Sequence, residues 1–502
     1  MTSPAFKSFE EFDRQYSGYQ LLPFRFARVP GVEGRVLLTS EVGEFVFLSE
    51  TQFKDFVRGN LAEGCDCSLD LEAKHFLFRG KPNLPIRLLA AKYRTKKAYL
   101  RGGPALHIFV VSLRCDHSCS YCQVSRQSTD RANFDMSPET VRLAIDRLFE
   151  CPSPNLTVEF QGGEPLLAFP TIKKIVEEIE TRNRVHGRQI TFTITSTLHH
   201  ITDEILAFFA KHGFEVSTSL DGSATLHNAN RPLPTRNSHE LTLAGIQKAR
   251  EALGATKVAA LTTLTSQSLQ APESIVDEYV RLGFRSIFLR PLSPYGFAVR
   301  SQRKTGYSMK AFLAFYERAL AHILQLNAAG VEINEVYTSI LLSHILTPFS
   351  SRYVDLRSPS GAALGALVYN YDGTVYASDE GRMLAEMGDT TFRLGLVSQP
   401  YSELMRSEAV DILLASGVAE SLPGCSDCAF LPYCGADPIH TYATQGEPVG
   451  HRTISDHCRR HMGMFNILFR YLAEADPVVM RIFLAWINQK SPAEFDHSRE
   501  VA

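Results

Sequence analysis

The pattern C-x3-C-x-Tyr-C places Cys115, Cys119 and Cys122 on one short stretch of the chain. Three thiolates so arranged can hold three irons of a [4Fe–4S] cluster and leave the fourth iron open for another ligand. The alternatives are a zinc knuckle or three unrelated thiols, but a structural zinc site usually takes four ligands from two cysteine pairs. The spacing therefore predicts iron–sulfur chemistry at an open iron.

A second group of cysteines follows the pattern C-x2-C-x5-C with a distant fourth member. Its residues are Cys425, Cys428, Cys434 and Cys458. Four thiolates can saturate a [4Fe–4S] cluster or close a zinc site, and the pattern alone leaves both open. The remaining cysteines, Cys65, Cys67 and Cys151, are interpreted as ordinary thiols. With only 10 cysteines in 502 residues, the chain indicates metal sites in a reducing compartment rather than a disulfide scaffold.

Composition describes a large chain with little net charge. The 52 basic and 54 acidic residues leave a formal charge of −2, so nothing favours nucleic acid or an anionic membrane as a partner. No apolar run approaches the roughly 20 residues of a membrane span, and the first residues lack the pattern of a signal peptide. We therefore expect a cytoplasmic protein of several domains.

Strand-like and helix-like segments alternate along the part of the chain that must position the first cysteine group. Strands are predicted at 107–113, 156–160, 189–195, 214–220, 257–264 and 286–290, with helices near 138–149, 171–184, 203–211, 243–253 and 273–282. Repeated βα units predict an α/β fold with a parallel sheet, outer helices and a site at the carboxyl ends of the strands. The cysteine stretch directly follows the first strand, as such a site requires.

Five regions are expected along the chain. The first, residues 1–104, contains a hairpin at 34–49, a helix from Glu50 and a further helix near 69–78, which together suggest a small winged-helix-like module. Such a module either binds a peptide as an added edge strand or merely packs on the core. Residues 105–300 form the βα region and 301–360 a helical connector. Residues 361–470 hold the second cysteine group, and 471–502 form a C-terminal helix and tail.

Two further motifs follow predicted strands. The string Gly162-Gly-Glu-Pro165 comes after the second strand, where paired glycines let the backbone approach a ligand and Glu164 can accept hydrogen bonds from an amino group. The string Ser219-Leu-Asp-Gly222 ends the fourth strand, and Arg231 follows it as a charged donor suited to a carboxylate. Alone, each string would be an ordinary turn.

The order of these motifs resembles that of the radical S-adenosylmethionine (SAM) enzymes, in which SAM chelates the open iron. The resemblance implies that reductive cleavage of SAM supplies a 5′-deoxyadenosyl radical, which abstracts a hydrogen atom from the substrate. It also implies a partial (β/α)6 barrel. By the same resemblance, the cofactor is held by Tyr121, Gly162, Gly163, Glu164, Pro165, Ser219, Arg231 and Leu292.

The second cysteine group is similar to that of the auxiliary-cluster domain called SPASM, found in maturases of sulfatases and of ribosomally made peptides. A full SPASM domain carries further cysteines where this chain has Ser378 and Pro438. The resemblance therefore implies one auxiliary [4Fe–4S] cluster and two clusters in total. It also places Asp379 where sulfatase-maturing enzymes carry the acid that takes the substrate proton, although an ordinary loop acid is the alternative.

Over its length the chain resembles the radical SAM maturases of the His-Xaa-Ser peptide system, through the strings at 22–26 and 369–373. This resemblance implies a peptide or small protein substrate with His-Xaa-Ser repeats and a reducing electron donor such as flavodoxin or ferredoxin. Two other functions stay open: a sulfatase-maturase-like enzyme acting on Ser or Cys, and a non-catalytic iron–sulfur protein for electron transfer. The SAM-binding set argues against the latter, because electron transfer alone does not need it.

Overall fold

The computed structural model describes residues 18–349 and 353–495, and its centre is a mixed sheet of nine strands. In spatial order the strands run β12-β10-β9-β8-β7-β6-β14-β15-β16. The first six in this order are β12 (Leu289–Arg290), β10 (Val258–Thr263), β9 (Glu215–Ser219), β8 (Gln189–Thr195), β7 (Asn155–Gly162) and β6 (Leu106–Ser112). All of these pair in parallel, which confirms the predicted order of βα units.

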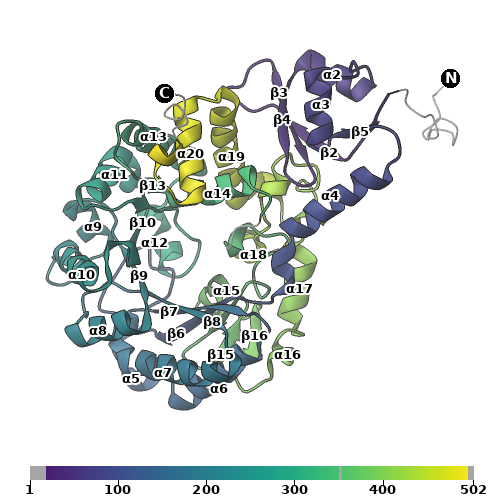
Figure 1. The fold of residues 1–502 in the computed structure, drawn as a ribbon. Coiled ribbons are helices and arrows are strands. Elements are labelled where there is room, and N and C mark those ends of the chain that lie inside the picture. Colours follow the sequence, from purple (N-terminus) through teal and green to yellow (C-terminus); the bar gives the residue numbers. More distant parts are fainter. Residues whose placement is uncertain (1–17, 350–352, 496–502) are drawn as a thin grey trace.

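Helices cover the outer side of this sheet and follow the strands in sequence (Figure 1). They are α6 (Pro138–Glu150), α7 (Phe169–His186), α8 (Asp203–His212), α10 (Ser238–Leu253) and α11 (Pro272–Arg281). Local chemistry sets their ends: the Thr202 side chain accepts a hydrogen bond from Ile205 N at the start of α8, and Gly213 ends it in the left-handed conformation. Apolar residues at helical spacing, such as Ile172, Ile175 and Val176, are fully buried against the sheet.

The C-terminal half extends the same sheet. Strand β14 (Ala366–Tyr369) pairs in parallel with β6, and β15 (Thr374–Tyr376) and β16 (Arg393–Leu396) continue it antiparallel. The Tyr369 hydroxyl lies 2.9 Å from His107 Nδ1 of β6, inside the core. The sheet thus joins the βα region to the segment that carries the second cysteine group, so the two regions share one sheet.

An N-terminal module contains the three-stranded antiparallel sheet β2 (Phe24–Ala27), β3 (Arg35–Ser40) and β4 (Phe45–Ser49). The predicted hairpin is β3–β4, and helix α2 (Glu50–Arg58) begins at a capping box formed by Ser49 and Gln52. The single helix predicted near 69–78 is wrong in part. Helix α3 (Asp66–Ala73) ends earlier, and β5 (Leu77–Phe78) pairs with β1 (Gln20–Leu21). A winged-helix identity for this module stays a prediction.

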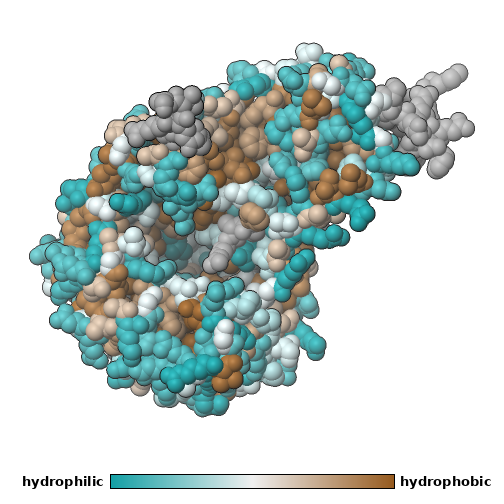
Figure 2. Space-filling model, viewed as in Figure 1, coloured by the Kyte–Doolittle hydropathy of each residue, from teal (hydrophilic) through white to brown (hydrophobic). Residues whose placement is uncertain are grey.

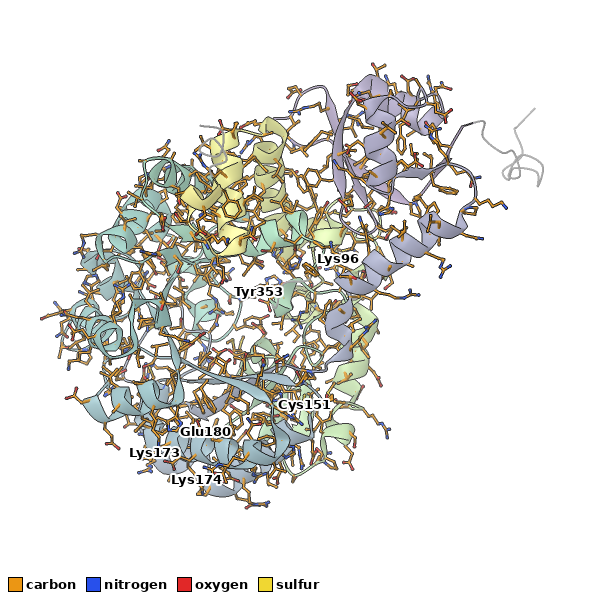
Figure 3. The ribbon with its side chains drawn as sticks, in the orientation of Figure 1. Lys96, Cys151, Lys173, Lys174, Glu180 and Tyr353 are labelled. Carbon is orange, nitrogen blue, oxygen red and sulfur yellow. The ribbon has the colours of Figure 1, made fainter. Side chains whose placement is uncertain are left out.

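The module packs on the C-terminal helix α19 (Asp456–Glu474), where the rings of Phe45 and Phe469 meet, and α20 (Pro477–Asn488) follows that helix. Helix α4 (Asn83–Lys96) runs from the module toward the rest of the molecule (Figure 1). Lys96, labelled in Figure 3 at this junction, is the last residue of α4. No helix in the described ranges is both long and apolar enough to cross a membrane. The expected domain boundaries remain our proposal for dividing the chain.

Candidate active site and cluster sites

A cavity of about 670 Å³ runs along the inside of the barrel, from residues at the starts of strands, such as Glu215 and Lys257, to the cysteine loop at the carboxyl ends. The sulfurs of the first cysteine group lie in its wall, as do polar side chains from several strands, among them Glu159, Thr195 and Arg290. Figure 2 shows this face of the molecule hollowed between the barrel and the C-terminal region. The cavity therefore occupies the place that the βα order predicts for a site.

Ionic and backbone contacts hold the cysteine loop at the end of β6. The Arg114 guanidinium donates to both carboxylate oxygens of Asp135, at 2.7 and 2.8 Å, in the two-pronged geometry that arginine favours. On the far side of the loop, Phe297 N donates to the carbonyl of Cys122 at 2.8 Å. Gly296 precedes it with a φ of +60°, and a Cβ there would lie 2.7 Å from that same carbonyl.

The spacing of the sulfurs separates a cluster from a single metal ion. Four sulfurs around one zinc ion, each at about 2.3 Å, lie about 3.8 Å from one another. In the described part of the chain, neither cysteine group places three sulfurs within 4.8 Å of one another, whereas Cys434, His457 and His461 each bring one ligand atom within that distance of the other two. A cubane spreads its thiolates more widely because its iron and sulfide atoms lie between them. The spacing of the sulfurs fits a [4Fe–4S] cluster at both groups, and the two histidines beside Cys434 form a second, zinc-like ligand set at the C-terminal group.

The glycines after β7 let this segment lie against the cysteine loop. Gly163 N donates to the carbonyl of Ser112 at 2.9 Å, and a Cβ on Gly163 would lie 2.3 Å from the carbonyl of Arg114. Gly162 has a φ of +152°, and a Cβ there would lie 1.9 Å from the Ser112 carbonyl oxygen. Both glycines are at the cavity wall, and only glycine permits this approach.

Glu164 lies behind the wall rather than in it. Its carboxylate is fully buried and accepts hydrogen bonds from Leu166 N, from the Ser196 hydroxyl and from Thr197 N, at 3.0, 2.7 and 2.7 Å. Pro165 follows it in the interior and begins a short 3-10 turn. Glu164 therefore positions the 196–197 turn, which reaches the cavity, and its own contact with a ligand stays a prediction.

Tyr121 and Arg231 meet through an acid that the sequence analysis gave no role. The Tyr121 hydroxyl donates to Asp221 at 2.7 Å, and Arg231 donates to the same hydroxyl at 3.0 Å. Asp221 is fully buried, and its other oxygen accepts from Thr263 N at 3.2 Å. Burial raises the pKa of Asp221, while the positive charge of Arg231 acts in the opposite direction. This unit orients the Arg231 guanidinium at the cavity wall, where Ser219 also lies.

The C-terminal half also lines the cavity, and its Arg382 reaches the cysteine loop, where Nη1 donates to the carbonyl of Val124 at 3.4 Å. Asp379 lines the cavity, and Arg382 Nε donates to the Asp379 carboxylate at 2.8 Å. Ser378 accepts a hydrogen bond from Gly381 N and so caps helix α15 (Asp379–Ala385). Leu292 lies in a side chamber next to the main cavity, and its backbone N–H donates to the Tyr307 hydroxyl.

The four cysteines of the C-terminal group lie close to one another. Burial raises the pKa of Cys434, and the next contributions come from the thiols of Cys428, Cys425 and Cys458, which places the four together. Cys458 lies in the first turn of α19, where Ser455 caps the helix. Pro438 begins helix α18 (Pro438–Gln445) instead of supplying a ligand. This region fits one auxiliary cluster.

Sequence reasoning missed the residues that hold the site rather than touch its cavity. Asp221 was visible inside the 219–222 string, but its partner Tyr121 lies 100 positions away. The partnership of Arg114 and Asp135 had no sequence signal, because each is an ordinary charged residue until the fold brings them together.

Comparison with known proteins agrees with this geometry. Residues 109–279 match the model of the Radical SAM superfamily. The cysteine-type anaerobic sulfatase-maturating enzyme of Clostridium perfringens is 24% identical over 292 residues, which are 55% of this chain and 75% of that enzyme. The solved structure of native anSMEcpe with bound AdoMet has a TM-score of 0.62 at 17% identity, covering 77% of this chain and 99% of that one.

A second solved structure, Streptococcus suis SuiB bound to precursor peptide SuiA, has a TM-score of 0.50 at 13% identity and covers 86% of this chain and 98% of that one. At such identities the likeness concerns the fold alone. A radical SAM domain uses a [4Fe–4S] cluster and SAM as cofactors, and the described cysteine loop and cavity fit both. Residues 109–279 of this chain therefore form a radical SAM domain with the α/β fold of that superfamily.

Proposed function

We propose that the protein is a radical SAM maturase that modifies a ribosomally made peptide or small protein. When bound, the cluster and SAM supply a 5′-deoxyadenosyl radical that abstracts a hydrogen atom from the substrate. The observation that supports this proposal is the union, in one cavity, of the cysteine loop, the two wall glycines and the Arg231 guanidinium.

The chain's own residues have distinct tasks in this proposal. Cys115, Cys119 and Cys122 hold the cluster. Arg231, oriented by Tyr121 and Asp221, binds the carboxylate of SAM as a charged donor. The backbone at Gly162 and Gly163 leaves room for SAM beside the cysteine loop. The surrounding barrel and C-terminal helices exclude water from a reactive carbon radical.

The C-terminal half supplies the far wall of the cavity. Asp379 is the candidate for holding a substrate proton, and Arg382 forms an ion pair with its carboxylate. Cys425, Cys428, Cys434 and Cys458 hold the auxiliary cluster. When bound, that cluster would supply one-electron chemistry.

A His-Xaa-Ser repeat peptide is the substrate that the sequence resemblance favours. Its support is sequence similarity alone. In the structure the two similar strings have structural roles: residues 369–373 form the tight turn between β14 and β15, and Phe24–Ala27 form strand β2. The relative from Clostridium perfringens favours a second candidate, a peptide whose Ser or Cys is oxidised. Both candidates use the same cavity and differ in the peptide.

An anaerobic assay tests the function. Reconstituted protein is incubated with dithionite, SAM and either a His-Xaa-Ser peptide or a sulfatase-type Cys peptide, and 5′-deoxyadenosine and peptide mass are followed. We expect about eight irons per chain, deoxyadenosine that disappears in Cys115→Ala, and a mass change in one peptide. A protein with its full complement of iron that forms no deoxyadenosine would overturn the proposal of an enzyme and favour an electron-transfer protein. A mass change only in the Cys peptide would replace the first substrate with the second.

A further inference from the structure

A side chamber of about 70 Å³ adjoins the main cavity on the side of the C-terminal helices. Arg290, Tyr353, Asp355 and Glu380 line both spaces, so the chamber is continuous with the place where a substrate would react. Figure 3 labels Tyr353 between the barrel and the C-terminal helices. Seven separate stretches of the chain contribute to the chamber, from residues 288–295 to Arg460 in α19.

Acidic side chains dominate the charge of this chamber. Asp355 lies in a 3-10 turn (Val354–Leu356), Glu380 in the first turn of α15, and Asp437 at the N-cap of α18. The guanidiniums of Arg290 and Arg460 also line it, which leaves a formal excess of one negative charge when all three acids are ionised. The neighbouring Asp379 does not add to this excess, because Arg382 pairs with it.

Burial, followed by the carboxylates of Asp355, Asp379 and Asp437 in that order, raises the pKa of Glu380 to about 8. Burial also raises the pKa of Asp355, with Asp437 as the next cause. Like charges held this close disfavour their own ionised forms. A positive group placed among them would relieve that repulsion.

An unpartnered hydroxyl provides an independent sign of a ligand. Tyr295 is 2% exposed and lines the chamber, and its hydroxyl has no hydrogen-bond partner among the described residues. Its pKa is raised by burial and then by Asp437, Glu380 and Asp355, which puts the hydroxyl near all three acids. A buried hydroxyl without a partner costs about 1–3 kcal/mol, so a polar group in the chamber would satisfy it.

The aromatic rings of the chamber suit one kind of polar group. Phe288 and Tyr337 stack at a centroid distance of 5.9 Å, and Tyr353 meets Tyr337 edge-on at 5.5 Å. Rings beside carboxylates attract a cation through both the π-face and the charge. The volume of the chamber limits the occupant to the head of a side chain rather than a whole residue.

We propose that this side chamber binds the positively charged head of a lysine, arginine or histidine side chain of the substrate peptide. The inference rests on the proposed function for its substrate class, and it adds a requirement: the residue that reacts in the main cavity is delivered by a basic residue close to it in the peptide.

Binding of small probes tests the chamber without turnover. The probes are N-acetyl-lysine amide, N-acetyl-arginine amide, N-acetyl-histidine amide and the neutral N-acetyl-norleucine amide, and their affinity for the reconstituted protein is measured by ligand-observed NMR under anaerobic conditions. We expect at least one basic probe to bind tenfold or more tightly than the neutral probe. Glu380→Gln and Asp355→Asn should each reduce this preference about tenfold, and the surface variant Glu204→Gln should keep it.

Tyr295→Phe is a second variant that keeps the ring and removes a hydroxyl without a partner, so its fold should be intact. We expect it to weaken the basic probe severalfold. Equal binding of basic and neutral probes to the wild type would overturn the proposal. Displacement of the basic probe by saturating SAM would also overturn it, since the chamber would then belong to the SAM pocket.

The outcomes for the chamber and for the proposed function are separable. If a peptide is modified but neutral replacement of its basic residues changes neither its KM nor the probe preference, the chamber proposal fails and the enzyme stands. The opposite outcome is that no peptide yields deoxyadenosine, while the wild type prefers basic probes and Glu380→Gln loses this preference. The enzyme proposal then fails and the chamber proposal stands.

Discussion

The buried unit of Tyr121, Asp221 and Arg231 shows how one acid can govern a site without facing its ligand. Asp221 is a buried carboxylate, and the Tyr121 hydroxyl joins it to Arg231, whose side chain is partly exposed at the cavity wall. A hydrogen bond to a charged group contributes about 1.5–3 kcal/mol to stability. We expect Asp221→Asn to lower the free energy of unfolding in urea by about that amount and to weaken SAM binding at least tenfold.

The control for this prediction is Glu204→Gln, because Glu204 is exposed and its nearest cation, Lys173 Nζ, is 3.8 Å away. Such exposed pairs contribute about 0–1 kcal/mol. Equal stability and equal SAM affinity in Asp221→Asn and Glu204→Gln would contradict the role given to Asp221. Titration calorimetry with SAM on the reconstituted protein measures the affinity.

Glu380 makes stability depend on pH in a defined direction. Its pKa is raised from 4.5 to about 8, first by burial and then by neighbouring acids. Between these values the folded state binds more protons than the unfolded state, so the stabilisation is present at low pH and is lost as pH rises through 8. We expect the difference in unfolding free energy between wild type and Glu380→Gln to fall from pH 5 to pH 8.5.

Urea unfolding at several pH values measures this difference. Other titratable and charged groups line the same chamber, and they titrate together with Glu380 rather than alone. These groups are Asp355, Asp437, Arg290, Arg460, His440, Tyr295, Tyr337 and Tyr353, with Asp379 beside them. A difference that is flat with pH, or that grows toward pH 8.5, would show that Glu380 is ionised in the folded protein at low pH.

At the scale of elements, the start of helix α12 (Phe297–Thr305) supports the cysteine loop. A Cβ on Gly296 would lie 2.6 Å from the carbonyl of Gln123 and 2.7 Å from that of Cys122, at a φ of +60°. We expect Gly296→Ala to displace the loop and to lower the iron bound after anaerobic reconstitution from about eight to about four per chain, because only the first cluster is affected.

Gly330→Ala is the matched control for backbone strain. Gly330 also has a positive φ, +89°, but nothing lies within 4 Å of the position of its Cβ. The strain of the left-handed conformation is thus shared, while the contact with the loop is not. Iron assays on both variants separate the two effects, and equal iron losses would assign the defect to strain instead of the loop.

Local sequence patterns were enough for the elements whose partners follow one another in the chain. Five barrel strands and their helices were predicted, because apolar periodicity and turn residues are local signals. The sixth, predicted at 286–290, is split: β11 (Ser286–Ile287) pairs with β13 (Asn334–Glu335), and only β12 joins the barrel sheet. The segment 69–78 failed where pairing is distant, since Leu77 and Phe78 complete a strand with Gln20 and Leu21. Strand β14 joining β6 had no local signal for the same reason.

The candidate site divides in the same way. Cysteine and glycine residues with motif spacing were predicted, whereas the side chamber could not be. Its charged residues come from positions 290, 355, 380, 437 and 460, each of which looks like a surface residue in the sequence. Only the packing of α15, α18 and α19 against the barrel turns them into one pocket.

At the scale of the whole molecule, the N-terminal module and the auxiliary-cluster region share one interface. The Thr39 hydroxyl donates to the carbonyl of Ala429 at 2.8 Å, and the Tyr433 hydroxyl donates to that of Gly43 at 3.0 Å. Tyr433 directly precedes Cys434, a proposed cluster ligand, and the ring of Phe469 lies 5.6 Å from the Tyr433 ring and 5.2 Å from that of Phe45. The module therefore packs against the loop that is proposed to carry the auxiliary cluster.

Phe469→Ala tests this coupling. Phe469 is fully buried, so its removal should cost about 3–5 kcal/mol of unfolding free energy. If the interface joins module and cluster loop, the variant should also lose iron from the auxiliary site and expose the module to limited proteolysis near residues 97–105, while deoxyadenosine formation without peptide persists. Phe26 belongs to the same module but is 49% exposed, so Phe26→Ala should retain both the iron and the protease resistance. Loss of stability in Phe469→Ala with full iron and unchanged proteolysis would mean that the module packs on the helices without supporting the cluster.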